Sequence, residues 1–328
     1  MTEMARLKAL AAAHWDIGEV RSTDQLGTAG RVHTIITQRN RYVLKEQDDP
    51  EKVDREAALL SRLRRHLPTA PPMVTRDGRH CAPHGDTFYV LYPFLQGDRL
   101  DHQRDVLVEG ATFVGEAIGR LHGALRDIEL AGYPTMNLVN DVVVRSRHII
   151  AQNRKHLDCG FAMAALTHFE RHMTAASPLL PQQIIHRDMH PGNILIRDDH
   201  LSGIVDFELS VRGARLFDPC YLATSILVDV FDEEEKRLQW PEFLVELLRS
   251  YGRRNRLTTH EITSVIGILN AIQLIFMAFS CTIDDIHAAK RNERILKWLY
   301  AEQGRIDRRI STLHTETPTV DTESPPAP

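Results

Sequence analysis

The sequence has only four cysteines in 328 residues, and no two of them form a Cys-x-x-Cys pair. Their wide spacing excludes a dense disulfide framework and a cysteine-rich zinc module, and it suits the reducing cytoplasm. An excess of positive charge is also lacking, because 40 Lys and Arg stand against 44 Asp and Glu and leave a net charge of −4. The chain therefore offers no bulk basic field for nucleic acid or for an anionic membrane surface.

Uninterrupted hydrophobic runs are lacking as well. The longest apolar stretch, residues 265–281, contains Asn270 and Gln273, whereas a membrane span needs about 20 largely apolar residues. We interpret this stretch as a buried helix of a helical lobe. The first 15 residues include Glu3 and only a short Ala/Leu run, so they predict an amphipathic helix rather than a secretory signal. We expect a cytoplasmic protein with no membrane partner and no nucleic-acid partner.

Hydrophobic patterning divides the chain into a strand-rich part and a helix-rich part. Residues 20–95 predict strands interrupted by one helix, whereas helical spacing dominates residues 105–310 apart from a strand-rich island at 183–211. The sequence therefore predicts a small, mostly β N-terminal lobe over residues 1–95. A larger, mostly helical lobe is predicted over residues 96–311.

The C-terminal residues 312–328 have a different composition from the rest. They are rich in Thr, Pro, Ser and Glu and contain almost no apolar side chains. Such a segment buries too little apolar surface to offset the entropy of ordering it, so it predicts a disordered tail.

The strand-rich island predicts a β-hairpin. Residues 194–197 and 203–207 are strand-like, and residues 198–202 between them are typical of a turn. A hairpin folded about the middle of this turn places Asn193 opposite Asp206. The two side chains are therefore expected to lie side by side at the open end of the hairpin.

Asp188 precedes this hairpin and adds a second carboxylate to the cluster. Two carboxylates and the amide oxygen of Asn193 form a hard, all-oxygen site of the kind that Mg²⁺ prefers. Taken alone, His186-x-Asp188-x-His190 also fits a transition-metal cluster of imidazole and carboxylate. The addition of Asn193 and Asp206 at their spacing favours a catalytic magnesium-phosphate site instead.

The stretch HRDMHPGN, followed by IVDFE, resembles the aminoglycoside phosphotransferase, choline kinase and homoserine kinase group. The similarity in layout covers roughly residues 20–305. The resemblance implies an α+β, protein-kinase-like fold of two lobes. It implies that Asp188 is the catalytic base and that Asn193 and Asp206 hold Mg²⁺. His190 would donate a hydrogen bond to the transferring phosphoryl group or brace the loop, and His186 would pack within it.

The same resemblance assigns an ion pair to the N-terminal lobe. Lys45 ends a predicted strand, Val43-Leu44-Lys45, at the position whose ammonium group meets the phosphates of ATP in this family. Glu56, in the helix that follows, is the expected partner that orients Lys45, and Glu51 is the rival assignment.

Two further segments resemble nucleotide-binding parts of the family. Gly27 and Gly30 permit close approach of backbone to phosphates, although their spacing departs from Gly-x-Gly-x-x-Gly and the signal is weak. The run from Tyr92 to Gly97, which includes Phe94, resembles the hinge between the lobes that holds adenine. A plain strand end followed by a turn would look the same.

The chain between Asp206 and Asp218 indicates the class of acceptor. Asp218-Pro219 begins a helix only 12 residues after Asp206, which leaves little chain for a peptide-docking segment. We therefore expect an ATP-dependent phosphotransferase that acts on a hydroxyl of an amino alcohol, a sugar or an aminoglycoside-type antibiotic. A protein Ser/Thr kinase and a non-catalytic pseudokinase are the alternatives.

Acidic residues in the predicted helical lobe offer one hint of acceptor charge. The stretch from Asp229 to Glu235 and the pair Asp284–Asp285 are rich in carboxylates, which would attract a cationic acceptor such as an aminoglycoside or choline. Charge runs of this kind are more often solvated helix faces, and the layout resembles homoserine-kinase-like members as much as resistance enzymes.

Overall fold

The computed structural model describes residues 2–26, 30–100 and 107–315, which form two compact units. Unit 1 combines Met1–Asp101, Arg120–Thr135 and Ile184–Arg212. Unit 2 combines His102–Gly119, Met136–Gln183 and Gly213–Pro328. The candidate site residues predicted from the sequence all belong to unit 1.

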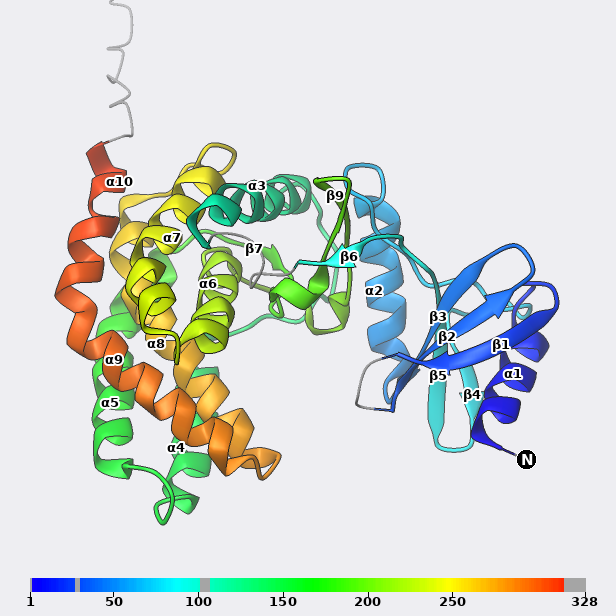
Figure 1. The fold of residues 1–328 in the computed structure, drawn as a ribbon, viewed down its shortest axis with the longest axis horizontal. Helices are drawn as coiled ribbons and strands as arrows, with labels where there is room; N and C mark the ends of the chain where they lie inside the picture. Colours follow the sequence, from blue (N-terminus) through cyan, green and yellow to red (C-terminus); the bar gives the residue numbers. More distant parts are fainter. Residues whose placement is uncertain (1, 27–29, 101–106, 316–328) are drawn as a thin grey trace, which may run out of the picture. The chain divides into compact units, whose positions relative to one another are not determined.

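Unit 1 contains a five-stranded antiparallel sheet in the order β1-β2-β3-β5-β4. Its strands are β1 Val20–Gln25, β2 Val32–Thr37, β3 Arg41–Gln47, β4 Ala82–His84 and β5 Thr87–Pro93. Helix α1, Glu3–His14, packs against β1 (Figure 1). The fully buried side chains of Trp15, Ile35, Leu44 and Leu91 belong to the core between them.

Helix α2, Pro50–Leu63, follows β3 and forms for local reasons. The Asp49 side chain accepts hydrogen bonds from two backbone N–H groups of the first turn, and Pro50 occupies a position that has no intrahelical partner to lose. Val53, Ala57 and Leu60 recur on one face and are buried. The helix predicted between the strands is therefore confirmed.

A second sheet of unit 1 holds the predicted hairpin, in the order β6-β8-β9. Its strands are β6 Asp98–Arg99, β8 Ile194–Arg197 and β9 His200–Ile204. The turn consists of Asp198 and Asp199 alone, both with positive φ (51° and 58°), a conformation that Asp tolerates better than most residues. The predicted five-residue turn, 198–202, is therefore wrong.

The register of the hairpin also differs from the prediction. It shifts between Leu195 and Ile196, so that Ile194 pairs with Ile204. Beyond this pair, the Val205 N–H donates to the Asn193 carbonyl at 3.1 Å. Asn193 thus lies opposite Val205, one residue from the predicted partner Asp206, because the turn is short and the ladder is irregular.

Helices dominate the rest of the chain: α3 Leu107–Leu125, α4 Leu138–Gln152, α5 Cys159–Ala176, α6 Phe217–Val230, α7 Glu234–Gly252, α8 Thr259–Thr282, α9 Ile286–Ile310 and α10 Thr312–Thr315. Short strands β7 Gln182–Ile185 and β10 Val211–Ala214 form a two-stranded sheet. An antiparallel sheet in the N-terminal part and helices in the C-terminal part confirm the predicted α+β class.

Helix α8 is the apolar stretch singled out in the sequence. It is long and apolar enough to cross a membrane, but 72% of its most apolar window is buried inside the protein. It packs against α4, α5, α6 and α9 of the same unit. A capping box between Thr258 and Glu261 starts the helix. The interpretation as a buried helix of a helical lobe is confirmed.

The predicted boundaries at residues 95 and 312 can be compared with the structure. The two units do not divide at residue 95, because unit 1 includes segments far beyond it, so the division into lobes over 1–95 and 96–311 stays a prediction. Residues 312–315 form α10, and Leu313 is only 7% exposed, which moves the start of any disordered tail past residue 315. The remaining tail residues lie outside the described part of the chain.

Candidate active site

His186, which is fully buried, holds the loop between β7 and β8 in place through its two ring nitrogens. One ring nitrogen, Nε2, is 2.9 Å from the Val205 carbonyl, and the other, Nδ1, accepts a hydrogen bond from the Asp188 backbone at 3.3 Å. The ring also lies 4.5 Å from the ring of Phe207, centroid to centroid. The prediction that His186 packs within the loop is confirmed.

Asn193 ends this loop and holds it through hydrogen bonds to two of its carbonyl groups. The side chain is 5% exposed, and its Nδ2 donates to the Asp188 carbonyl at 2.9 Å. The Asn193 backbone N–H donates to the His190 carbonyl, also at 2.9 Å. Because the amide nitrogen is committed to Asp188, the amide oxygen is the atom that Asn193 can offer to a cation.

His190 adopts a defined tautomer. Its Nδ1 accepts a hydrogen bond from the Gly192 N–H at 3.1 Å, so the proton of the neutral ring lies on Nε2. That nitrogen is 3.8 Å from Asp188 Oδ2. Burial lowers the pKa of His190 although the Asp188 carboxylate opposes the shift. His190 therefore presents a neutral N–H donor beside the predicted catalytic base.

Asp206 follows the hairpin in a left-handed conformation, with φ of 68°. Non-glycine residues in this conformation are uncommon and concentrate at functional sites. Its Oδ1 lies 2.7 Å from Lys45 Nζ. Burial alone would raise the pKa of Asp206, but the Lys45 ammonium group outweighs it and lowers the pKa. Asp206 is therefore ionised, as a metal-binding carboxylate must be.

Lys45 has a second partner that the sequence did not predict. Glu208 Oε2 lies 2.7 Å from Lys45 Nζ, and the same oxygen accepts a hydrogen bond from Gln47 Nε2 at 3.0 Å. Burial would lower the pKa of Lys45, but the two carboxylates raise it overall. The sequence could have indicated Glu208, because this carboxylate stands only two residues after Asp206.

The predicted pair of Lys45 with Glu56 is not formed. Glu56 is 5% exposed and accepts a hydrogen bond from the Tyr92 hydroxyl at 2.8 Å. Burial raises the pKa of Glu56 to about 7, against the opposing effects of Tyr92 and Lys45. Desolvation favours the neutral carboxyl, which Tyr92 satisfies without an ammonium partner. The rival Glu51 is exposed and pairs with Arg55 within α2.

The remaining nucleotide-side residues are only partly described. Gly27 lies outside the described residues. Gly30 has φ of 70° and open space where a side chain would be, which fits a backbone that must approach a ligand. Phe94 lies under Arg41, whose guanidinium carbon is 4.2 Å from the ring centroid, and the Phe94 N–H donates to the Arg41 carbonyl. Contacts of Tyr92 and Phe94 with adenine stay predictions.

The donor set fits a hard divalent cation. Asp206 supplies an ionised carboxylate and Asn193 an amide oxygen, and both are oxygen ligands. The described residues contain no group of three or more His, Cys, Asp or Glu side chains that would enclose a metal by themselves. A cation held here must take other ligands from phosphate and water, as Mg²⁺ does at phosphoryl-transfer sites.

Two carboxylates of the acidic stretch of unit 2 are paired with basic side chains of that unit. Asp232 forms ion pairs with Arg291 and Arg294 at 3.3 and 2.6 Å. The hydrogen bond from Arg294 holds the pKa of Asp232 below its usual value. Glu233 pairs with Lys236 at 2.8 Å. These contacts support the interpretation as solvated helix ends rather than as an acidic acceptor site.

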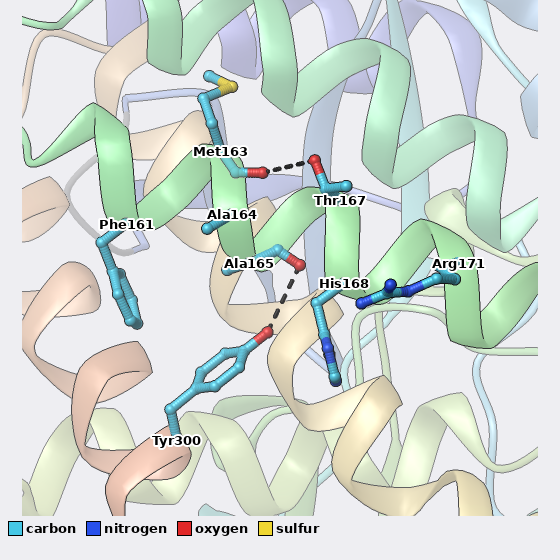
Figure 2. A pocket seen from close by; sticks show the side chains of 8 residues that line it. All are labelled: Phe161, Met163, Ala164, Ala165, Thr167, His168, Arg171 and Tyr300. Carbon is cyan, nitrogen blue, oxygen red and sulfur yellow. Dashed lines mark hydrogen bonds between the residues drawn. The ribbon is translucent and has the colours of Figure 1, made fainter.

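Unit 2 also contains an open groove of about 610 Å³ along α5 (Figure 2). Phe161 and Tyr300 meet edge to face, 5.5 Å between ring centroids, and the Tyr300 hydroxyl donates to the Ala165 carbonyl. His168 and Arg171 complete its polar side. None of the residues expected to carry the chemistry lines this groove.

Comparison with known proteins shows which family the chain resembles in sequence. The model of the phosphotransferase enzyme family matches residues 25–262. A homoserine kinase from Zymomonas mobilis is 26% identical over 267 residues, which cover 76% of this chain and 77% of that protein.

Solved structures agree in fold. An amicoumacin kinase in complex with AMP-PNP and Ca²⁺ superposes with a TM-score of 0.69 at 14% identity, over 97% of this chain and 98% of that one. A choline kinase from Streptococcus pneumoniae gives a TM-score of 0.62 at 11% identity, over 94% and 98%. At these identities the likeness carries the fold alone.

Proposed function

Because this chain belongs to the phosphotransferase enzyme family and is a small-molecule kinase, we propose that Asp188 is the base through which it phosphorylates a hydroxyl group. The reaction transfers the γ-phosphoryl group of ATP. The observation that carries the assignment is that Asn193 bonds the Asp188 carbonyl and lies opposite Val205, the neighbour of Asp206. Phosphoryl transfer depends mostly on positioning and charge neutralisation, and this cluster offers both.

Two residues of the loop, Asp188 and His190, act directly in the proposed reaction. Asp188 orients the acceptor hydroxyl and takes its proton as the hydroxyl oxygen bonds to the γ-phosphorus. The bond from that phosphorus to the bridging oxygen of ADP breaks at the same time. His190 donates its Nε2–H to the transferring phosphoryl oxygens, since its Nδ1 already accepts from Gly192.

Lys45, Asn193 and Asp206 hold the nucleotide in this proposal. Lys45 exchanges at least one of its two carboxylate partners for phosphate oxygens. Asn193 and Asp206 hold Mg²⁺ through their oxygens, and the bound ion supplies charge neutralisation of the phosphates. Gly27 and Gly30 approach the phosphates, and Tyr92 and Phe94 border the adenine.

The acceptor is proposed to be a small hydroxylated molecule, and homoserine is the first to test because a curated relative is a homoserine kinase. The four cysteines of the chain are all free thiols, which suits the cytoplasm in which we place the reaction.

The test is ADP release by the purified full chain with ATP and Mg²⁺, measured over a panel of acceptors. The panel contains hydroxy amino acids, amino alcohols, sugars and aminoglycosides, and mass spectrometry identifies the phosphorylated product. We expect saturable turnover of at least one small molecule and trace labelling of generic proteins. Efficient labelling of a protein on Ser or Thr, with no small-molecule acceptor, contradicts the proposal. Absence of ATP binding in a folded protein favours a pseudokinase.

A further inference from the structure

Arg99 lies beside the catalytic loop but has no place in the reaction described so far. It ends strand β6 and pairs in register with Leu195 of β8, two residues after the loop ends. Its Cδ is 4.0 Å from the point where a side chain on Gly192 would begin, and that point is 2.8 Å from His190 Cε1. The Arg99 side chain therefore reaches the loop next to the Nδ1–Cε1 edge of the His190 ring.

The Nε2 atom of the same ring lies near the proposed catalytic base, 3.8 Å from Asp188 Oδ2. One imidazole ring thus separates the approach of Arg99 from Asp188. A compact acceptor whose hydroxyl is at Asp188 can extend a second polar group past His190 toward Arg99.

Arg99 carries a positive charge that no carboxylate among the described residues compensates. Two other exposed arginines of unit 1 have carboxylate partners: Arg31 pairs with Asp48 at 2.7 Å, and Arg79 pairs with Asp77. The charge of Arg99 acts on the loop electrostatically. Burial lowers the pKa of His190, and the positive charge of Arg99 lowers it further. An unpaired guanidinium group beside a reaction centre is suited to bind an oxyanion through two parallel hydrogen bonds.

We propose that Arg99 binds the carboxylate of the acceptor and thereby selects hydroxy amino acids over amino alcohols. This inference rests on the proposed function, because it assumes that the acceptor hydroxyl is at Asp188. The phosphates have their own cation in Lys45, which is held by Asp206 and Glu208 in the same unit.

The experiment compares acceptors that differ only in the carboxylate. Homoserine and 3-amino-1-propanol form one such pair, serine and ethanolamine a second, and threonine and 1-amino-2-propanol a third. We expect kcat/KM of the wild type to be higher for the carboxylate-bearing member of the pair that it uses. Preference for the member without a carboxylate overturns the role of Arg99 but leaves the proposed kinase activity intact. Absence of turnover with any hydroxyl acceptor overturns the proposed function itself.

The variant Arg99→Gln removes the guanidinium group. A lost bidentate contact to a charged group is worth about 1.5–3 kcal/mol, so KM for the hydroxy amino acid should rise about 10- to 150-fold. KM for ATP and kcat/KM for the matching amino alcohol should not change. Arg99→Lys should restore only part of the loss, because an ammonium group lacks the planar fork.

Arg197→Gln is the matched control, since Arg197 is an exposed arginine of β8 that bonds Gln96 at the other end of the strand. It should leave all three kinetic constants unchanged. A rise in KM for ATP in Arg99→Gln, with KM for the acceptor unchanged, assigns Arg99 to a nucleotide phosphate and overturns the carboxylate proposal. Equal constants in Arg99→Gln and the wild type overturn it as well.

Discussion

Replacing Glu56 with glutamine tests the electrostatics of the site, because this carboxyl titrates near neutral pH. Burial raises its pKa from 4.5 to about 7. A carboxyl whose pKa is higher in the folded state stabilises the fold below its unfolded pKa and loses that contribution as the pH rises through the folded pKa. At about 1.4 kcal/mol per pKa unit, the stability lost between pH 4.5 and pH 8 is about 3 kcal/mol.

Glu56→Gln keeps an oxygen that accepts the Tyr92 hydrogen bond but has no proton to lose. We expect the variant to match the wild type near pH 4.5 and to become more stable as the pH rises, by up to about 3 kcal/mol at pH 8. Urea unfolding of the nucleotide-free full chain at several pH values measures this difference. Glu51→Gln is the control, because the Glu51 side chain is 86% exposed on the same helix.

The reasoning is refuted if the difference between Glu56→Gln and the wild type does not depend on pH. It is also refuted if the variant is less stable than the wild type at pH 8, since Glu56 would then be ionised and favourably paired in the folded state. A pH-dependent change in Glu51→Gln of similar size would show that the effect belongs to α2 as a whole.

Four other changes test separate parts of the site. Asp188→Ala should lower kcat by about 10²–10⁴ while equilibrium binding of ATP is retained; normal turnover would reassign the base. Lys45→Arg should raise KM for ATP at least about tenfold, because a planar fork does not replace a compact ammonium group, and an unchanged KM would place the phosphate contact elsewhere. Gly192→Ala places a methyl group 2.8 Å from His190 Cε1, so kcat should fall with KM for ATP unchanged. Truncation after Thr315 should leave the melting temperature unchanged, and a lower one would show that the deleted segment packs on the protein.

The hydrogen-bonded structure of the loop from His186 to Asn193 depends mainly on residues that are close together in the sequence. Asp188, His190 and Asn193 lie within six residues of one another, so short-range hydrogen bonds fix most of their geometry. The brace through His186 was also predictable, because a histidine two residues before Asp188 can bond back to the loop. Local sequence determines local geometry here, and the resemblance to a known motif supplied the roles.

The partners of Lys45 were harder to predict, because they lie 161 residues or more along the chain. Three acidic residues, Glu56, Asp206 and Glu208, surround one ammonium group. Which of them pairs with it depends on the desolvation of each carboxyl, and Glu56 is buried against Tyr92 instead. The sequence indicates the set of charges, whereas burial decides their pairing.

The register of the hairpin was also predicted incorrectly, by one residue. Spacing predicted that Asn193 and Asp206 approach each other, and the structure brings Asn193 opposite Val205, the neighbour of Asp206. The error of one residue arises from a turn of two residues and an irregular ladder. The two-residue turn depends on positive φ values at Asp198 and Asp199, which residue type permits but does not require.

The class of acceptor depends most on placement that sequence spacing does not show. Arg99 is one of many arginines in the sequence, and only the pairing of β6 with β8 brings it beside His190. Conversely, two carboxylates of the acidic stretch that suggested a cationic acceptor, Asp232 and Glu233, are paired with basic side chains. A charge indicates a ligand only where the fold leaves it uncompensated near the reacting atoms. By that criterion the positive charge of Arg99 beside the loop favours an acceptor that carries a carboxylate.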